Sequence, residues 1–407
     1  MTKRLQRDSI MAAEFHHLVR AVGLLICAFV AACSINGGAG LVAENEPIAE
    51  APGEQAPDRP AIKVAMLLPL SGGNAQNVAK ALKQSGELAL FDFDNPNVEL
   101  ISKDTHGTPE GAKSAAEEAV AQGVELVIGP LFANEVKAAS PITQAANIPM
   151  IAFSSDQKVA GNGVYLLSFL AGSDVHRIIS FAVSRGKSRF AALIPQTDYG
   201  RLVQEKFIAA AKDMNVSVLA VKEYPQDANG MIEPVKEIAA LVPKGEEPQI
   251  DALFIPAAAN TLPALAPLLP YAEIDTKTVQ LLGTSGWDYQ GVGKEDALVG
   301  AWFPAPEPKG WTDFTKRYVE TYGEVPLRLA TLGYDAVSLA ISLSNNSSGS
   351  RYTAEQLTRS NGFSGVDGLF RLRSDGTSQR GFAILEVQKY GNQVIEAAPN
   401  GFSLAEY

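Results

Sequence analysis

Cysteine and histidine are scarce in this chain of 407 residues, which holds two cysteines and four histidines. Both cysteines, Cys27 and Cys33, lie near the N-terminus, so the rest of the sequence has no thiol for an internal disulfide, a redox pair or a thiolate metal site. After His17 the remaining histidines are His106 and His176, which are far apart in the sequence. This spacing argues against a histidine-built zinc site and against the usual pairing of a nucleophile with histidine. We therefore expect no metal site.

Motifs of enzymes and nucleotide-binding proteins are also missing. The chain has no Gly-x-x-x-x-Gly-Lys-Ser/Thr loop, no complete Gly-x-Gly-x-x-Gly, no His-Glu-x-x-His and no Gly-x-Ser-x-Gly. Two Ser-x-x-Lys matches, at Ser155 and Ser184, lack the second motif that accompanies them in penicillin-reactive enzymes. Carboxylates such as Asp104 and Asp198 show no spacing of a catalytic pair, and solvated or helix-capping acids are the default interpretation. We expect a protein without catalytic activity and without a cofactor.

Positive charge is in deficit as well. The chain has 34 Lys and Arg against 45 Asp and Glu, a formal net charge of −11. This balance argues against nucleic acid as a partner, because its phosphates attract basic surfaces. With 46% hydrophobic and 19% charged residues, the composition is that of a globular protein long enough for two core-bearing units.

The N-terminal segment differs from the rest of the chain. Four basic residues precede an apolar run from Ala21 to Ala32, which is too short to span a bilayer comfortably. The run ends in Val-Ala-Ala-Cys33, which resembles the lipobox of bacterial lipoproteins. An uncleaved anchor helix and a buried structural cysteine are the alternatives, but the order of these features favours a signal peptide over residues 1–32 and lipidation of Cys33. The true start, Met1 or Met11, stays open.

A lipid on Cys33 would hold the protein on a membrane, since each buried methylene contributes about 0.8 kcal/mol and stable attachment takes more than one chain. The resemblance to lipoproteins of Gram-negative type implies the outer membrane, because Ser34 and not Asp follows the cysteine. Residues 33–60 are rich in Gly, Pro, Ala and Glu, which favours a flexible tether. We expect a lipid-anchored protein on the periplasmic face of a membrane, the outer membrane.

From Ala61 onward, short runs of β-branched and aliphatic residues alternate with longer segments of helical period. This alternation is typical of βαβ units and parallel sheets, and its length favours two Rossmann-like lobes over one very large sheet. The predicted strands are Ile62–Leu68, Val98–Ser102, Leu126–Ile128, Met150–Phe153, Arg189–Ile194, Val216–Glu223, Ala252–Ile255 and Gln280–Leu282. The predicted helices cover residues 75–90, 110–122, 134–146, 173–185, 199–213, 230–241 and 311–322.

Local signals add detail to this pattern. Ser173, Asp198 and Thr312 stand where helix N-caps are expected. The run Asn-Asn-Ser-Ser-Gly-Ser that begins at Asn345 predicts a turn or loop, and residues 381–389 alternate like a strand. The tail is thus expected to pair back onto a lobe.

Three loops leave the C-terminal ends of predicted strands, where open α/β sheets place their ligands. They are Leu68-Pro-Leu-Ser-Gly-Gly73, Gly129-Pro-Leu-Phe-Ala-Asn134 and Phe153-Ser-Ser-Asp156. In this order and spacing they resemble the leucine-binding group of type I periplasmic binding proteins, and the likeness runs from about residue 61 to 390. The resemblance implies an α/β fold of two Rossmann-like lobes with parallel sheets, joined by a hinge of three crossings, that close on a small molecule.

The same resemblance assigns residues to the lobes and to the cleft between them. It implies that lobe one contains residues 61–172 plus 306–345 and that lobe two contains residues 173–305 plus 346–395. Hydroxyls and backbone N–H groups of lobe one would accept a carboxylate, and lobe two would supply the facing wall. The positions that match the family's cleft are Ser71, Phe132, Ala133, Ser154 and Ser155 in lobe one and Tyr199, Ala257, Asn260 and Ser285 in lobe two.

Two positions depart from the amino-acid binders of this group. Pro-Leu-Phe-Ala-Asn134 stands where those proteins have a polar Ser/Thr run, and Ser285 stands where they place an acid for the ammonium group. Asp288 is the candidate substitute for that acid, because an ammonium group needs a counter-charge when it is buried.

A second resemblance bears on function. The segments Gly129–Val136, Leu167–Phe169, Gly283–Trp287 and Gly300–Phe303, together with the lipobox, are similar to the penicillin-binding protein activator lipoproteins, which share the fold. This resemblance implies regulation of peptidoglycan synthesis through contact with a peptidoglycan synthase, and we prefer it. The alternative is the substrate-binding lipoprotein of an ABC importer for branched-chain amino acids or a similar small solute, whose partner is an ABC permease.

Overall fold

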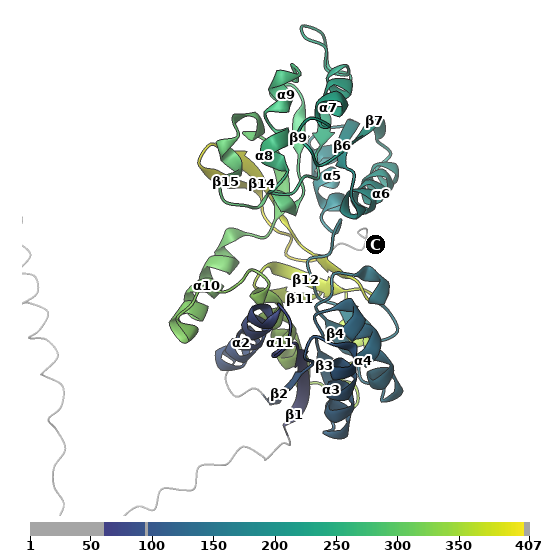
Figure 1. Ribbon diagram of the computed structural model, residues 1–407, viewed down its shortest axis with the longest axis vertical. Coiled ribbons are helices and arrows are strands. Elements are labelled where there is room, and N and C mark those ends of the chain that lie inside the picture. Colours follow the sequence, from purple (N-terminus) through teal and green to yellow (C-terminus); the bar gives the residue numbers. More distant parts are fainter. Residues whose placement is uncertain (1–60, 94–96, 403–407) are drawn as a thin grey trace, which may run out of the picture. The chain divides into compact units, whose positions relative to one another are not determined.

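The computed structural model describes residues 61–93 and 97–402, which form an α/β fold with two lobes (Figure 1). One lobe is built on a five-stranded parallel sheet and the other on a seven-stranded sheet that is mostly parallel. The predicted fold class is confirmed. The predicted signal peptide, the tether and the lipidation site at Cys33 lie outside the described residues.

Lobe one is a sheet covered by helices on both faces. Its strand order is β2-β1-β3-β4-β5, and every pair is parallel. The strands are β1 (Ile62–Leu68), β2 (Val98–Asp104), β3 (Leu126–Ile128), β4 (Met150–Ala152) and β5 (Val164–Leu166). The helices are α2 (Gln76–Asp92), α3 (Pro109–Ala121), α4 (Ala133–Ala145), α10 (Pro308–Tyr322) and α11 (Ala330–Ser344).

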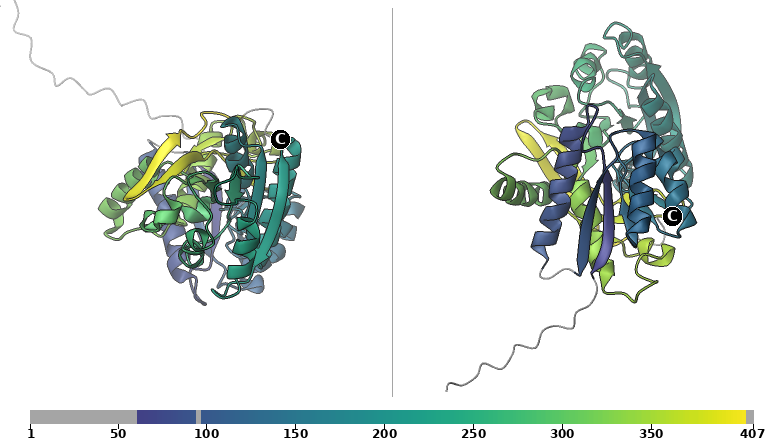
Figure 2. Two further views of the ribbon diagram at one scale, coloured as in Figure 1. Left: turned by 90° about the horizontal axis from the view of Figure 1, so that it is seen from above. Right: turned by 60° about the horizontal axis from the view of Figure 1, so that its bottom comes forward.

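The alternation of side chains along β1 explains the two cores of lobe one. Val64 and Met66 pack with α2 and α11 on one face of the sheet, whereas Ala65 and Leu67 pack with α3 and α4 on the other. Successive side chains of a strand point to opposite faces, so a strand that is buried on both faces reads as a continuous apolar run. Figure 2 (right) shows β1 and β2 with helices on either side.

Lobe two follows the same plan with an antiparallel addition at one edge. Its strand order is β15-β14-β10-β9-β8-β6-β7, in which β14 and β15 are antiparallel to their neighbours. The strands are β6 (Arg189–Pro195), β7 (Ser217–Tyr224), β8 (Ala252–Phe254), β9 (Gln280–Leu282), β10 (Trp302–Ala305), β14 (Ala383–Gln388) and β15 (Gly391–Glu396). The helices are α5 (Val175–Ser184), α6 (Asp198–Asp213), α7 (Ile232–Ala239), α8 (Leu262–Leu265) and α9 (Leu268–Tyr271).

The chain passes between the lobes at three places. The first crossing joins β5 to α5, the second joins β10 to α10, and the third joins β13 (Ser378–Arg380) to β14. All eight predicted strands are present, with ends shifted by no more than two residues, and residues 381–389 return to lobe two as β14. All seven predicted helices are present as well.

Residues 346–380 pack with lobe one, although the resemblance to the leucine-binding group implied lobe two. They contain α12 (Ala354–Leu357), β11 (Phe363–Gly365), β12 (Gly368–Leu372) and β13, and the three strands form an antiparallel sheet. The apolar side chains of this segment, among them Leu357, Phe363 and Phe370, share one core with Ile62 and Leu339. Alternating apolar residues on β11 and β12 bury one face of this small sheet beside α11, which draws the segment into lobe one.

The predicted helix N-caps were misplaced. Helix α6 is capped by Thr197, one residue before Asp198, because the Thr197 hydroxyl accepts a backbone N–H of the first turn. Helix α10 begins at Pro308, which suits a first helical position because it has no N–H to leave unpaired, and so Thr312 lies inside the helix. Ser173 lies just before the N-cap residue of α5.

Candidate functional site

A cavity of about 520 Å³ lies where the crossings meet the two lobes, and we call it the cleft cavity. Its lining includes residues of both lobes and of all three crossings. The lining residues are Ser155, Phe169, Leu170, Ala171, Gly172, Ser173, Asp174, Tyr199, Ala258, Ser285, Gly286, Asp288, Pro306, Arg328 and Phe382.

One part of the cleft cavity is apolar. Phe169, Leu170, Pro306 and Phe382 contribute aromatic and aliphatic surface from the three crossings. The Phe169 ring has the guanidinium groups of Arg328 and Arg380 at 5.4 and 4.9 Å from its centroid. Such cation–π contacts fix the ring in place. The cavity therefore offers a firm apolar surface to the hydrocarbon part of a ligand.

The carboxyl group of Asp174 adds a buried acid to this cavity. Asp174 is 3% exposed, and its Oδ2 accepts the backbone N–H of Ser285 at 2.6 Å. Burial raises the pKa of Asp174, against the opposing effect of the hydrogen bonds with Ser285. Nearby, the Tyr199 hydroxyl lies 3.1 Å from Thr284 Oγ1, and burial followed by the charge of Asp174 raises the pKa of Tyr199. A cationic group in the cavity would relieve the cost of keeping this acid ionised.

Asp288 and Arg328 bring opposite charges to the cavity from different lobes. Burial raises the pKa of Asp288, and the charge of Arg328 acts against that rise. Arg328 Nη2 donates to Oδ1 of the buried Asp367 at 2.5 Å. Its Nη1 is buried and has no hydrogen-bond partner among the described residues. Because a buried donor without a partner costs free energy, this guanidinium retains capacity for one more acceptor.

Four of the ten residues predicted for the cleft line this cavity, namely Ser155, Tyr199, Ser285 and Asp288. The other six are Ser71, Phe132, Ala133, Ser154, Ala257 and Asn260, and none of them belongs to its lining. Ala257 is 1% exposed and packs in the core of lobe two, and Ser154 accepts the backbone N–H of Asp156 through its hydroxyl. These two positions serve their own loops and do not face the cavity.

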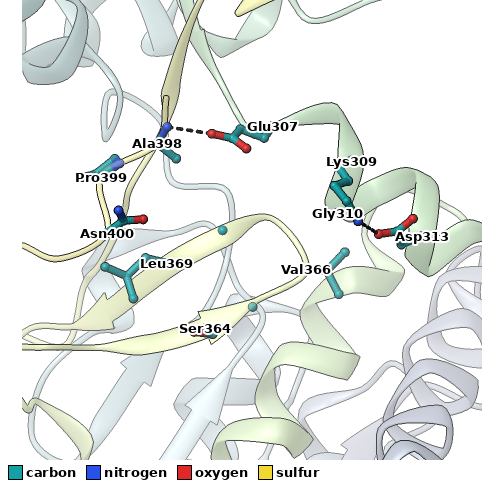
Figure 3. Close-up of a pocket in the computed structure, with 12 residues that line it drawn as sticks. Glu307, Lys309, Gly310, Asp313, Ser364, Val366, Leu369, Ala398, Pro399 and Asn400 are labelled. Atoms are coloured by element: carbon teal, nitrogen blue, oxygen red, sulfur yellow. Dashed lines mark hydrogen bonds and ion pairs between the residues drawn. The ribbon is translucent and has the colours of Figure 1, made fainter. Parts of the chain in front are cut away.

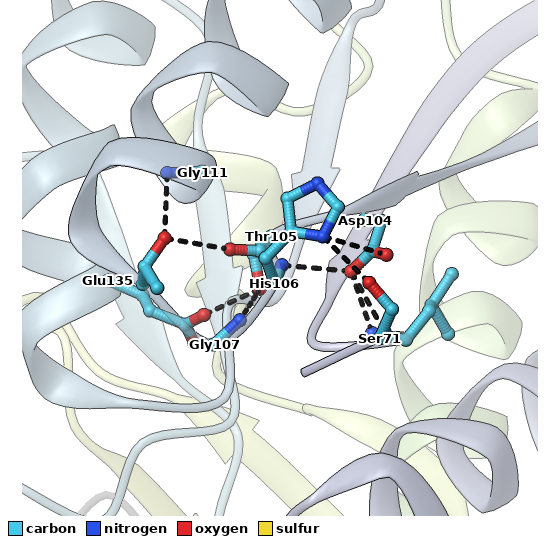
Figure 4. Close-up of polar contacts among 9 residues, drawn as sticks. Ser71, Asp104, Thr105, His106, Gly107, Gly111 and Glu135 are labelled. Atoms are coloured by element: carbon cyan, nitrogen blue, oxygen red, sulfur yellow. Dashed lines mark hydrogen bonds and ion pairs between the residues drawn. The ribbon is translucent and has the colours of Figure 1, made fainter. Parts of the chain in front are cut away.

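Ser71 takes part in a loop network with Asp104 and His106 (Figure 4). Asp104 Oδ1 accepts the backbone N–H groups of Leu70, Ser71 and His106 at 3.0, 3.1 and 2.8 Å. Burial opposes ionisation of Asp104, but the hydrogen bonds with Ser71 and His106 outweigh it and lower the pKa. Ser71 Oγ and Asp104 Oδ2 approach the same imidazole nitrogen, Nδ1, at 2.7 and 3.2 Å. In a catalytic triad the serine and the acid contact different ring nitrogens of the histidine, so these three residues are not arranged as a triad. Their contacts join the loop that contains Ser71 to the loop that contains His106.

Phe132 and Ala133 stand at the start of α4, where Glu135 caps the helix. Glu135 is fully buried, and its two carboxylate oxygens accept the Phe132 N–H at 3.1 Å and the Thr105 hydroxyl at 2.5 Å. Burial raises the pKa of Glu135, while the hydrogen bond from Thr105 opposes the rise. This capping box explains the local sequence without a ligand.

A further cavity of about 380 Å³ lies beside the start of α10 (Figure 3). Its walls are the first turn of α10, the turn between β11 and β12, and the segment Ala398–Asn400 that follows β15. Glu307 Oε1 accepts the Ala398 N–H at 2.9 Å and so ties that segment to the second crossing.

Neither a metal centre nor a membrane span is found in the part of the chain that the structure describes. Residues 61–93 and 97–402 bring together no group of three or more His, Cys, Asp or Glu side chains suited to a metal ion. Within the same residues, no helix combines the length and the apolar character needed to cross a bilayer.

Comparisons with known proteins agree with this geometry. A family described as periplasmic binding protein matches residues 61–392. A solved structure from Rhodospirillum rubrum, provisionally assigned to branched-chain amino acid ABC transport, has a TM-score of 0.68 and 18% identity and covers 82% of this chain and 100% of its own. A solute-binding protein of an ABC transporter from Rhodopseudomonas palustris, in complex with 3,4-dihydroxybenzoic acid, has a TM-score of 0.54 and 18% identity over 84% and 97% of the two chains. These two likenesses show the fold.

One curated relative matches a shorter stretch. It is an uncharacterised protein of Rickettsia prowazekii, 24% identical over 179 residues. The match covers 44% of this chain and 47% of the relative, so the chain matches about half the length of that protein.

Proposed function

The chain belongs to the periplasmic binding proteins, and from this premise we propose that it is the solute receptor of an ABC importer, with an ABC permease as its partner. Binding is proposed to occur in the cleft cavity, without chemical change of the solute. The observation that supports this most is the composition of that cavity, which takes its lining from both lobes and all three crossings. A ligand held there contacts the two lobes at once, and so it favours the closed arrangement of the hinge.

We propose that the solute is a small amphipathic molecule with an amino group and a carboxylate. The apolar part would lie against Phe169 and Phe382. The buried Asp174 supplies the counter-charge for an ammonium group that the sequence lacks at Ser285, and its Oδ2 already accepts the Ser285 N–H. Arg328 would donate a hydrogen bond to the carboxylate through Nη1, which has no partner among the described residues. Branched-chain amino acids fit this pattern.

The regulator hypothesis loses support because its motifs have structural roles. Within Gly129–Val136, Glu135 caps α4 and is fully buried. Within Gly283–Trp287, the Trp287 indole is fully buried, donates to Ile255 O at 3.1 Å, and covers Gly283 so closely that any side chain there would overlap the ring. These residues are required by the fold and do not distinguish a protein-binding regulator from a receptor. Contact with a peptidoglycan synthase is therefore our second candidate.

A matched ligand series tests the proposed receptor. Leucine carries both charged groups, 3-methylbutylamine lacks the carboxylate, and 4-methylpentanoate lacks the amino group. We expect leucine to raise the melting temperature of the purified full chain most, because a ligand that binds only the folded state stabilises it more the more tightly it binds at a given concentration. If none of the three ligands changes the melting temperature and an immobilised peptidoglycan synthase retains the chain, the receptor proposal is wrong.

Two variants assign the charged groups. Asp174→Asn should weaken leucine and 3-methylbutylamine binding roughly tenfold or more while 4-methylpentanoate binding is unchanged, since hydrogen bonds to charged groups are worth about 1.5–3 kcal/mol. Arg328→Lys, which keeps the charge beside Asp367, should weaken leucine and 4-methylpentanoate binding instead. Asp198→Asn is the matched control, because Asp198 is 93% exposed and outside the cavity.

Attachment to a membrane through Cys33 is part of the proposal. The lipobox that ends in Cys33 supports it. Changing Cys33→Ala should release the folded protein into the soluble periplasmic fraction, because the acyl chains supply the anchor. Cell fractionation measures this directly, and persistence of the variant in the membrane fraction would rule out the lipid anchor.

A further inference from the structure

A small cavity of about 170 Å³ shares the first crossing with the cleft cavity, and we call it the hinge cavity. Both cavities are lined by Leu170, Ala171, Gly172 and Ser173. The other lining residues of the hinge cavity are Gln157, His176, Lys206, Asp213, Arg373, Thr377, Ser378 and Gln379. The hinge cavity therefore also takes residues from both lobes.

A buried hydroxyl without a partner lines the hinge cavity. Ser378, the first residue of β13, is 6% exposed. Its Oγ has no hydrogen-bond partner among the described residues. A hydroxyl can donate one hydrogen bond and accept two, and leaving it unpaired in the interior costs free energy. This hydroxyl is suited to donate to an oxygen atom held in the cavity.

Two cations from different lobes meet at the same cavity. Arg373 follows β12 in lobe one, and Lys206 lies on α6 in lobe two. Neither forms an ion pair within 4.0 Å in the described part of the chain. The Lys206 side chain packs against the first crossing, since its Cγ lies 3.0 Å from where a Cβ on Gly172 would be.

The charges of Arg373 and Lys206 both act on the carboxyl group of Asp375. Burial opposes ionisation of its carboxyl, but hydrogen bonds from Thr377 and then the charges of Arg373 and Lys206 outweigh it and lower the pKa. Oδ1 of Asp375 accepts both the N–H and the hydroxyl of Thr377, at 2.8 and 2.6 Å. Asp375 does not line the cavity, and it forms no ion pair within 4.0 Å with Arg373 or Lys206 in the described part of the chain.

The N-terminus of α5 borders the hinge cavity, whereas its N-cap residue, Asp174, lines the cleft cavity. Ser173 and His176 line it from either side of the helix N-terminus, where backbone N–H groups point outward and carry partial positive charge. Asp213 is the single carboxylate among the lining residues. The lining thus contains two permanent cations, Arg373 and Lys206, and the unpaired hydroxyl of Ser378, against a single acid.

We propose that the hinge cavity is a binding site for a small oxyanion of the phosphate or sulfate type, held by Arg373 and Ser378 from lobe one and by Lys206 from lobe two. The cavity volume suits an ion of this size. Arginine and lysine form strong, charge-assisted hydrogen bonds with such oxygens. The anion joins the two lobes at the first crossing, and so it restricts the movement of the segment that also forms the wall of the cleft cavity.

The site therefore couples to the proposed solute site through Leu170–Ser173. If the bound anion favours one arrangement of the crossing, then anion and cleft ligand change each other's affinity by the same factor. Anion binding itself does not depend on the proposed receptor function, because it needs no cleft ligand. The two proposals can fail separately.

Isothermal titration of the full chain with inorganic sulfate and with inorganic phosphate, in a low-salt buffer free of both, tests the site. We expect saturable binding of one anion per chain that weakens as chloride is added, because surface charges are screened by salt. The variants Lys206→Ala and Arg373→Ala should each weaken it roughly tenfold or more. Ser378→Ala should weaken it by a smaller factor and leave the fold intact, since the hydroxyl has no partner to lose.

The matched control is Lys212→Ala, which removes an exposed lysine from the same helix outside the cavity. Its affinity for the anion should equal that of the unchanged protein. Absence of saturable binding, or an equal loss in Lys212→Ala and Lys206→Ala, would overturn the proposal. Retention of full binding by Arg373→Ala in a folded variant, judged by its far-UV circular dichroism, would overturn it as well.

Discussion

The two lobes bury different kinds of side chain. Among its described residues, lobe one encloses five acidic or basic side chains at 4% exposure or less, namely Glu135, Asp335, Asp367, Arg371 and Arg380. Among the described residues of lobe two, Asp174 is the only buried acidic or basic side chain, and it lines the cleft cavity. The largest side chains at the core of lobe two are aromatic, including Trp287, Phe207 and Phe254.

The two lobes also differ in how their buried charged groups lie relative to the cleft cavity. In lobe one, Arg380 lies 3.4 Å from Asp335 and over the ring of Phe169, while Arg328 joins Asp367 to the cleft cavity. Two separate ion pairs of lobe one thus lie close to the third crossing and to the wall of the cleft cavity. Lobe two has an aromatic core instead, and in its described part the buried Asp174 carboxyl forms no ion pair.

The largest expected effect comes from the aromatic core of lobe two. Trp287→Ala should destabilise the protein by about 4–5 kcal/mol, because it leaves a large cavity and removes the donor to Ile255 O. The loss should be the same at pH 5 and pH 7.5, since no charged group is involved. Urea unfolding followed by far-UV circular dichroism measures it. A loss below about 1 kcal/mol would show that lobe two does not depend on this core.

The ion network of lobe one should respond differently. Arg380→Met should cost about 3–5 kcal/mol at pH 7.5, because it leaves the Asp335 carboxylate in the interior without its partner. At pH 5 the cost should be smaller, since the raised pKa of Asp335 lets this acid take up a proton and lose its charge. Urea unfolding of Arg380→Met at the two pH values measures the loss of stability. A loss that is equal at both pH values would mean that the two lobes do not differ in the pH dependence of their cores.

The third prediction concerns Asp335 alone. Burial, opposed by the charge of Arg380, raises the pKa of Asp335 to about 6, well above its value of about 3.9 in an unfolded chain. Between these values the folded protein holds a proton that the unfolded chain has lost. The contribution of Asp335 to stability therefore falls as the pH rises from about 4 to about 6, and it stays constant above that range.

The variant Asp335→Asn removes this titration. Its free energy of unfolding relative to the unchanged protein should increase by about 2–3 kcal/mol between pH 4 and pH 7.5. This figure follows from the rise of about 2 in the pKa of Asp335, since a change of one in pKa corresponds to about 1.4 kcal/mol. Parallel urea unfolding of both proteins at the two pH values gives the difference. If the stability gap is constant or widens with pH, then Asp335 is ionised throughout and the raised pKa is wrong.

Most of the fold followed from the sequence because its strands and helices have distinct periods. Helix α11 was missed for a physical reason: it is buried on nearly every side, including Thr331, Gly333 and Asp335, so it has no polar face to reveal its period. The short strands of the antiparallel sheet, such as β11 and β13, were missed because three residues are too few to show alternation.

The cleft cavity was harder to predict than the fold. Ser285 was assigned to the cleft by the resemblance to the leucine-binding group, and Asp288 was the candidate substitute for the acid of that group; both line the cavity. Asp174, Arg328 and Phe382 come from crossings and loops that are far apart in the sequence, and no local pattern joins them. A weak signal existed for Asp174, since a Ser-Asp pair stands just before a helix, but helix capping accounts for such a pair equally well.

The smallest expected effect tests whether the contrast between the lobes is confined to buried groups. Lobe one has a surface ion pair between Lys80 and Glu324 at 2.7 Å, and lobe two has one between Lys244 and Glu273 at 3.5 Å. All four side chains are close to half exposed or more, so water and salt screen both pairs. Lys80→Ala and Lys244→Ala should each cost about 0–1 kcal/mol by urea unfolding, with no difference between the lobes. A clearly larger loss of stability for Lys80→Ala would mean that lobe one depends on ion pairs at its surface as well as in its interior. The difference between the lobes would then not be limited to buried charged groups.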